Sequence, residues 1–423
     1  MRPVSDEAVS DEAVALAELM PWSSAPVRPG REWVTAPDPR SLKARWEALL
    51  RAGGEPERAA LFGETRSRTL RSRVPQLPGQ TAPTVPLARA DEPCPAPVPV
   101  LFGPYDQRWL IPDHRVLDAA RPELWRVADD EQLFVVEAAD PEAADEQVTV
   151  TGVLPLARGG RIRPLYRRPG GVEPNVVPGL LPMLSDRYGS PVGAGELVAW
   201  IAAAAETGPR GDRVVPLPGN PEMWREGVEL GREALRLRPG PPGGMERPRL
   251  PGGRRPYVRA AIPVRPAGLR YEAEDEALLL LGVDGSEGRI APVAREVWES
   301  RAGGTGVLES WFAGRAVGAS GAVGDGRGAS GASVGEGLAA IGPAGWSREW
   351  TSALLELVTV LTLAAGLRPR RRAFAERLRR DPHRIGTRAL TAAGVLPVPP
   401  AARRPASVLD HHEEGPDGQF ALV

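Results

Sequence analysis

Apolar residues recur at helical spacing in several segments of the chain. In the first, Leu42, Trp46 and Leu49 lie on one face of a predicted helix that begins after Asp38-Pro39 and ends at Gly53-Gly54. The same periodicity predicts further helices at about 56–63, before Gly189, at 195–206, at 222–237 and at 306–314. The helical content of the fold is therefore substantial.

The clearest helical pattern runs from Ser347 to Ala365. Its apolar face carries Trp350 and Leu361, two residues whose spacing is close to three helical turns. We expect this helix to end at Gly366, because glycine is common just after a helix and Pro369 follows.

Other segments have the pattern of strands. The segments 132–136 and 147–154 are rich in valine and threonine, which are frequent in sheets. The segment 257–290 is predicted to be β-rich, because apolar residues occupy alternate positions from 258 to 264. The apolar run 278–283 before the turn residues Asp284-Gly285 is typical of a buried strand. The predicted fold class is therefore α+β, with helical and β-rich parts, helical spacers and disordered Gly/Pro-rich segments.

Changes in composition suggest boundaries between these parts. Seven prolines lie in 75–98, and glycine, alanine and serine dominate 314–345. We expect an N-terminal helical part (1–74), a Pro-rich linker (75–98), a mixed core with a helical part (99–240), a β-rich part (241–313), a disordered Gly/Ala/Ser insertion (314–345), C-terminal helices (346–394) and a disordered tail (395–423).

The formal net charge of −1 conceals an unusual basic composition. Lys43 is the only lysine among 53 basic residues, and all the others are arginine. The arginine fork suits phosphate groups and guanine edges better than lysine does.

The single cysteine, Cys94, excludes an intrachain disulfide and a cysteine-based zinc site. The acidic N-terminus and the lack of a long apolar run lead us to expect a soluble, cytoplasmic protein with no membrane contact.

One stretch, 105–125, concentrates aromatic and basic side chains. It contains Trp109, Trp125 and three candidate DNA-binding arginines, Arg108, Arg115 and Arg121. Two interpretations are open. The aromatic faces and guanidinium groups suit base stacking and phosphate binding. The alternative is a core junction in which the tryptophans pack inward and the arginines face solvent.

A second basic–aromatic cluster lies in a predicted loop at 158–168. Five arginines surround one tyrosine there, and all six residues are candidates for nucleic-acid contact: Arg158, Arg161, Arg163, Tyr166, Arg167 and Arg168.

Motifs of catalysis are missing from the sequence. Lys43 follows neither a glycine-rich loop nor an acidic residue at the spacing that ATPases and metal-dependent nucleases require. The sequence has no Asn/Asp-Pro-Pro-aromatic tetrad of adenine methyltransferases, and His114 and His383 have no evident metal-ligand partners. We therefore expect no catalytic residue, no metal site and no cofactor in this chain, and an arginine-rich surface that faces nucleic acid.

The order of several short motifs resembles the C-terminal target-recognition region of type ISP restriction–modification enzymes. The matching motifs span about 20–365 and are Pro21-Trp22-Ser23-Ser24, Arg31-Glu32-Trp33, Arg45-Trp46, Leu61-Phe62-Gly63-Glu64-Thr65-Arg66-Ser67-Arg68, Tyr105-Asp106-Gln107-Arg108-Trp109, Arg121-Pro122-Glu123-Leu124-Trp125, Pro174-Asn175-Val176-Val177-Pro178-Gly179-Leu180, Glu229-Leu230-Gly231-Arg232, Glu296-Val297-Trp298-Glu299, Gly304 and Val307-Leu308-Glu309-Ser310-Trp311-Phe312.

This resemblance implies a sequence-specific DNA target-recognition subunit, with 99–240 as its recognition core. Double-stranded DNA would be its partner, together with a separate adenine methyltransferase subunit that alone would bind S-adenosylmethionine. Two departures from the family pattern stand out: Ser300 replaces an expected aromatic residue, and 314–345 is an unusual insertion. Three other functions stay open: a protein-interaction scaffold, a decayed relative without DNA binding, and part of a DNA methyltransferase enzyme.

The resemblance also changes how the stretch 105–125 is interpreted. A motif shared by proteins that read different targets is a poor candidate for base reading. We therefore predict that Trp109 and Trp125 are core anchors, and that the more variable loop 158–168 carries specificity.

Overall fold

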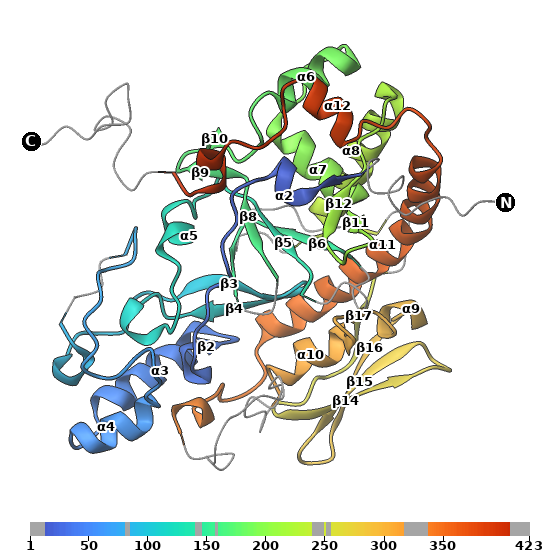
Figure 1. Ribbon diagram of the computed structural model, residues 1–423. Helices are drawn as coiled ribbons and strands as arrows, with labels where there is room; N and C mark the ends of the chain where they lie inside the picture. The colour runs from blue at the N-terminus through green and yellow to red at the C-terminus, as the bar shows by residue number, and fades with distance from the viewer. Residues whose placement is uncertain are drawn as a thin grey trace, which may run out of the picture.

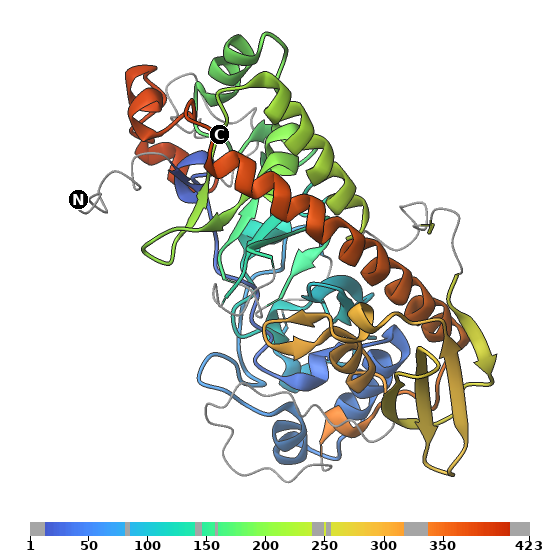
Figure 2. The same ribbon diagram turned by 90° about the vertical axis from the view of Figure 1, so that its right-hand side faces the viewer.

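The computed structural model describes residues 13–80, 85–139, 146–156, 160–238, 249–250, 255–316 and 337–406. Their apolar side chains form three main hydrophobic clusters, here called the first, second and third cluster. The long helix α11 (Arg348–Arg379) connects the third cluster to the first and runs along the molecule in both views (Figure 1, Figure 2). The mixture of helices and sheets confirms the predicted α+β class.

The first cluster is built on a pair of helices. Its elements are α2 (Leu16–Leu19), α6 (Leu180–Tyr188), α7 (Ala194–Ala204), α8 (Pro221–Arg236), α12 (Thr387–Ala392) and the sheet β1 (Val14–Ala15), β12 (Arg213–Val215) and β11 (Glu206–Thr207). Helices α7 and α8 pack closely because Gly227 and Gly231 face Trp200 and the Ala199 carbonyl, where side chains would clash. Trp200 also stacks on Trp224 of α8, with ring centroids 4.9 Å apart.

The second cluster contains the N-terminal helices and two small sheets. Its helices are α3 (Pro39–Leu50), α4 (Glu55–Phe62) and α5 (Pro122–Arg126). One sheet has the order β2 (Thr35–Ala36), β4 (Asp106–Leu110), β3 (Val98–Gly103) and β7 (Leu154–Pro155), and the other has β6 (Val148–Thr151), β5 (Phe134–Glu137) and β8 (Ile162–Pro164). Along β5, Phe134 and Val136 pack into the second cluster and Val135 into the first, as strand periodicity requires.

The third cluster combines a four-stranded antiparallel sheet with short helices. The sheet has the order β13 (Tyr257–Ala260), β16 (Glu287–Ala291), β15 (Ala277–Gly282) and β14 (Pro266–Glu272). Between it and α11 lie α9 (Arg295–Trp298), the hairpin of β17 (Arg301–Ala302) and β18 (Thr305–Gly306), and α10 (Val307–Ala313). Leu278, Leu280 and Ile290 form the buried face of this sheet, in agreement with the predicted buried strand.

The predicted end of the last long helix at Gly366 is wrong. Helix α11 continues through Gly366 and Pro369 to Arg379. A proline inside a helix costs about 3 kcal/mol, and burial of Phe374 and Leu378 in the first cluster offsets this loss. By length and hydropathy α11 also qualifies as a membrane span, which is weak evidence, since its apolar residues pack inside the protein.

Parts of two predicted disordered segments are packed. In the Gly/Ala/Ser insertion, residues 337–345 are ordered: Arg45 donates to the carbonyls of Ala339 and Ile341, and Leu338 is buried in the second cluster. Near the C-terminus, Val395, Leu396 and Val398 belong to the first cluster, and Ala402 packs against it. Residues 317–336 and 407–423 lie outside the described residues.

The prediction of a loop at 158–168 is also wrong. Most of its described residues form β8 and β9 (Tyr166–Arg168), and β9 pairs with β10 (Val172–Pro174). All three residues of β8 are buried, and β8 pairs with β5, which lies earlier in the sequence. The arginine-rich pattern of 158–168 is local and does not reveal this pairing. Arg158 lies outside the described residues.

Candidate nucleic-acid interface

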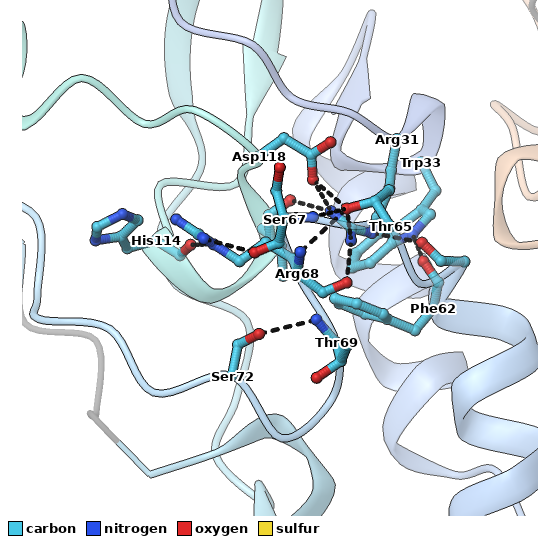
Figure 3. A network of polar contacts seen from close by, with 12 residues as sticks. Arg31, Trp33, Phe62, Thr65, Ser67, Arg68, Thr69, Ser72, His114 and Asp118 are labelled. Atoms are coloured by element: carbon cyan, nitrogen blue, oxygen red, sulfur yellow. Dashed lines mark hydrogen bonds and ion pairs between the residues drawn. The ribbon is translucent and has the colours of Figure 1, made fainter.

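The stretch 105–125 is held to the N-terminal segment by a buried polar network (Figure 3). The Arg31 guanidinium donates to Asp118 at 3.1 Å, to the Gly63 carbonyl at 2.9 Å and to the Arg68 carbonyl at 3.1 Å. Thr65 donates to the same Asp118 carboxylate. Burial lowers the pKa of Arg31, and the Asp118 charge opposes this effect. The network joins three distant segments, so its role is to fix the framework.

The two tryptophans of this stretch pack against the hydrophobic core, in agreement with the prediction that they are core anchors. Trp125 is buried in the second cluster, and its indole Nε1 donates to the Ala120 carbonyl at 2.7 Å. Trp109 is half-buried and packs against the same cluster. The buried Trp125 ring is therefore not free to stack on a base.

Arg115 and Arg121 are also parts of the framework. Arg115 is fully buried, binds the Asp113 carboxylate through two nitrogens and lies 2.6 Å from Glu92. Arg121 is the N-cap of α5, has a positive φ of 58° and is half-buried. Its Nε atom is buried and has no hydrogen-bond partner among the described residues.

Arg108 is the candidate of this stretch whose side chain lines the large cleft. Its Nε donates to Asp106 at 2.9 Å, and its guanidinium lies 3.5 Å from the centre of the Phe102 ring. Asp106 also accepts from Arg315 at 2.9 Å, so one carboxylate bridges two guanidinium groups. The three groups together carry a net positive charge beside the cleft described below.

The described candidates between 161 and 168 differ in exposure. Arg163 is buried and donates to Glu137 at 2.8 Å and to the Met20 carbonyl. Arg167 and Arg168 both bind Glu173, and Tyr166 packs on the first cluster. Arg161 is exposed beside a small hollow of about 340 Å³. These contacts leave Arg161 as the best placed of them to meet a ligand.

A much larger cleft, of about 1990 Å³, opens where residues of all three clusters meet α11. Small-molecule pockets usually span about 300–1,000 Å³, so this cleft suits a larger ligand. Ten arginines and six carboxylates line it, which makes its lining positive. The arginines are Arg28, Arg31, Arg45, Arg108, Arg301, Arg368, Arg371, Arg372, Arg379 and Arg384.

Several of the cleft arginines have structural partners. Arg371 binds Glu146 at 2.6 Å, Arg379 binds Glu206 at 3.2 Å, and Arg45 donates only to backbone carbonyls. Burial lowers the pKa of Arg45 to about 10, so it stays charged at neutral pH.

Three cleft arginines are exposed and have no carboxylate partner within the described ranges: Arg28, Arg301 and Arg372. They come from the segment before Arg31, from the β17–β18 hairpin and from the second half of α11. Sequence reasoning did not select them. Only Arg372 lies in a stretch with a visible signal, the arginine-rich run 368–388. A solvated helix face can have the same run of charges, so the sequence does not distinguish the two.

No group of three or more His, Cys, Asp or Glu side chains that could hold a metal ion is found in the described part of the chain. The excess of arginines over carboxylates in the lining of the cleft suits the binding of an anion.

Solved structures with a similar fold come from larger proteins. A cryo-electron microscopy structure of a DrdV–DNA complex has a TM-score of 0.56 and 14% identity, over 87% of this chain and 38% of that chain. The ATP-dependent type ISP restriction–modification enzyme LlaBIII bound to DNA has a TM-score of 0.56 and 11% identity, over 89% and 24%.

A nuclease-deletion mutant of the type ISP enzyme LlaGI in complex with a DNA substrate mimic has a TM-score of 0.51 and 12% identity, over 89% and 29%. This chain therefore spans only 24–38% of the length of these neighbours. A search of curated protein sequences found no match.

The sequence itself matches a family over residues 18–356, which is most of the chain. That range contains the ordered motifs from Pro21-Trp22 to Trp311-Phe312 and most of the residues that line the cleft, Arg28 and Arg301 among them, whereas Arg372 lies beyond it. The chain belongs to the family of type ISP C-terminal specificity domains.

Proposed function

We propose that this protein is the sequence-specific DNA target-recognition part of a type ISP-like restriction–modification system, and that double-stranded DNA binds in the arginine-lined cleft. The observation that carries the proposal is the set of exposed arginines without carboxylate partners, Arg28, Arg301 and Arg372, around one cleft of about 1990 Å³. Family membership and the DNA complexes of the structural neighbours support it.

A duplex is a polyanion, and its affinity for a protein rises with each phosphate that an arginine neutralises. The cleft arginines come from separate segments held by buried ion pairs, so they are preorganised to contact phosphates along one ligand. The arginine fork can donate two parallel hydrogen bonds to one phosphate.

We further propose that the chain is non-catalytic and acts with an adenine methyltransferase, on which S-adenosylmethionine binds. The protein would then act in the cytoplasm, where the DNA is. Titration with S-adenosylmethionine tests the catalytic alternative, because we expect no heat of binding to this chain alone.

The test of DNA binding is fluorescence anisotropy with a labelled duplex at increasing salt. We expect binding that weakens steeply with salt, and a slope of log K against log salt that falls by about 1 in Arg372→Ala and in Arg28→Ala. The control is Arg51→Ala, because Arg51 is exposed at the C-cap of α3, outside the cleft.

An absence of duplex binding at low salt, with the fold intact by circular dichroism, contradicts the proposal. That result favours the protein-interaction scaffold or a decayed relative.

A further inference from the structure

The hairpin of β17 and β18 forms part of the cleft wall, next to α10 and the second half of α11. Ser300, Arg301, Ala302, Gly303 and Thr305 all line the cleft. Arg301, Gly303, Gly304 and Thr305 are exposed, so the tip of the hairpin is accessible to a ligand.

The base of the hairpin is rigidly held. Ser300 is buried, its Oγ donates to the Glu296 carbonyl at 2.8 Å, and its carbonyl accepts from the Val307 amide at 2.9 Å. Arg368 of α11 donates to the same Ser300 hydroxyl at 3.4 Å. The serine that replaces an expected aromatic residue therefore connects the hairpin to α11. Precise readout needs such a fixed support.

The tip of the hairpin is narrow. Gly303 and Gly304 have φ values of 56° and 79°, which suit a two-residue turn between antiparallel strands. A side chain added at either glycine would meet open space. The tip consists of backbone alone, so it can approach a ligand closely.

Arg301 has no side chain opposite it in the hairpin. It pairs with Gly306, and Ala302 pairs with Thr305, so the two strands put Arg301 and Thr305 on opposite faces. Within the described residues, its guanidinium makes only a long hydrogen bond of 3.4 Å to the Gly304 carbonyl. Its donors are therefore available to a ligand.

We propose that the β17–β18 hairpin enters the DNA major groove and that Arg301 reads a guanine edge. This inference rests on the proposed function. A two-stranded ribbon fits the major groove, and an arginine fork can donate to both O6 and N7 of guanine. Arg372 lies on the long helix α11, and Arg28 lies on an extended segment that pairs with Ala119. Neither residue is on a projecting hairpin, so both suit contacts with phosphates.

The experiment is selection of bound sequences from a random duplex library, followed by affinity measurements on the selected duplex and on single-base variants. The variants are Arg301→Ala, Arg301→Lys and Arg372→Ala. Arg295→Ala is the matched control, because Arg295 is exposed on the neighbouring α9, outside the cleft, and pairs with Glu299. Thermal unfolding of each variant checks the fold.

We expect Arg301→Ala to lose the preference for guanine at one position, by roughly 5- to 150-fold, with other positions unchanged. Arg301→Lys should keep the charge and the salt dependence but lose most of that preference, because lysine lacks the fork. Arg372→Ala should weaken binding equally for all sequences, and Arg295→Ala should behave as the wild type.

Three outcomes overturn the inference. If wild-type protein selects a sequence and Arg301→Ala selects the same one with the same preference, the hairpin does not read bases, although the proposed function stands. A uniform loss of affinity in Arg301→Ala assigns Arg301 to a phosphate instead. Wild-type protein that binds no duplex at all contradicts the proposed function itself.

Discussion

Arg315 Nη1 lies 2.9 Å from Asp106 Oδ1, although 209 residues separate the two in the sequence. Both side chains are buried, and Asp106 also accepts from Arg108 beside the cleft. This ion pair joins the β3–β4 turn of the second cluster to the end of α10 in the third. The relative position of two cleft walls therefore depends on it.

Replacement of the Asp106 carboxylate should destabilise the folded protein strongly. In Asp106→Ala the buried Arg315 loses its only carboxylate partner among the described residues, so we expect a loss of about 3–5 kcal/mol in the free energy of unfolding. Denaturant titration measures it. Glu47→Ala, which removes an exposed pair with Arg51, is the control and should cost less than about 1 kcal/mol. Equal effects of the two substitutions would show that the buried pair is not important for stability.

We expect Arg163 to contribute to the stability of the fold. Its guanidinium is buried with Glu137 and the Met20 carbonyl, so Arg163→Ala should destabilise the protein by about 3–5 kcal/mol. The exposed neighbour Arg161 is the comparison, and Arg161→Ala should change stability by less than about 0.5 kcal/mol. Thermal unfolding separates the two. A stable Arg163→Ala variant with weaker DNA binding would restore the role that the sequence suggested for this residue.

Two glycines in helices should respond to alanine in opposite directions. A Cβ at Gly231 would lie 1.8 Å from the Ala199 carbonyl oxygen, so Gly231→Ala should force α7 and α8 apart and cost at least about 1–3 kcal/mol. Gly366 in α11 is exposed with open space around it, and Gly366→Ala should stabilise the protein by roughly 0.5–1 kcal/mol. Calorimetry tests both, and stabilisation by Gly231→Ala would contradict the close packing.

His114 should make stability depend on pH. Burial lowers the pKa of its imidazole, whose Nδ1 lies 2.9 Å from the Pro75 carbonyl and must donate to it. Since the folded-state pKa lies below the unfolded value of about 6.5, the unfolded chain binds more protons below that pH. Stability is therefore full above about pH 6.5 and falls as the pH decreases.

The measurement is the melting temperature between pH 5 and pH 7.5 for wild type and His114→Gln, where the amide can still donate to Pro75. We expect a shallower decrease in the variant. Identical pH profiles would show that this histidine titrates alike in the folded and unfolded chain.

The single thiol should be unreactive in the folded protein. Burial raises the pKa of Cys94 to about 12, so little thiolate is present at pH 8. We expect a colorimetric thiol reagent to modify the native chain roughly a hundred- to a thousandfold more slowly than the chain in denaturant. Fast modification without unfolding would mean that the segment around Cys94 opens readily.

The sequence predicted those features that depend on local pattern. Apolar periodicity located α3, α7 and α8, and the apolar run 278–283 located β15. The order of short motifs was sufficient to identify the family. These predictions succeed because helix and strand periodicity and the spacing of motifs are written along the chain itself.

Tertiary contacts decided the rest. Helix α11 passes Pro369 because Phe374 and Leu378 are buried by a distant part of the chain. Arg115 and Arg163 are framework residues because folding brings Glu92 and Glu137 to them, whereas Arg301 and Arg372 remain open to the cleft. An arginine has the same local signature in either place, and only its partner, chosen by the fold, determines whether its charge is used inside the protein or offered to a ligand.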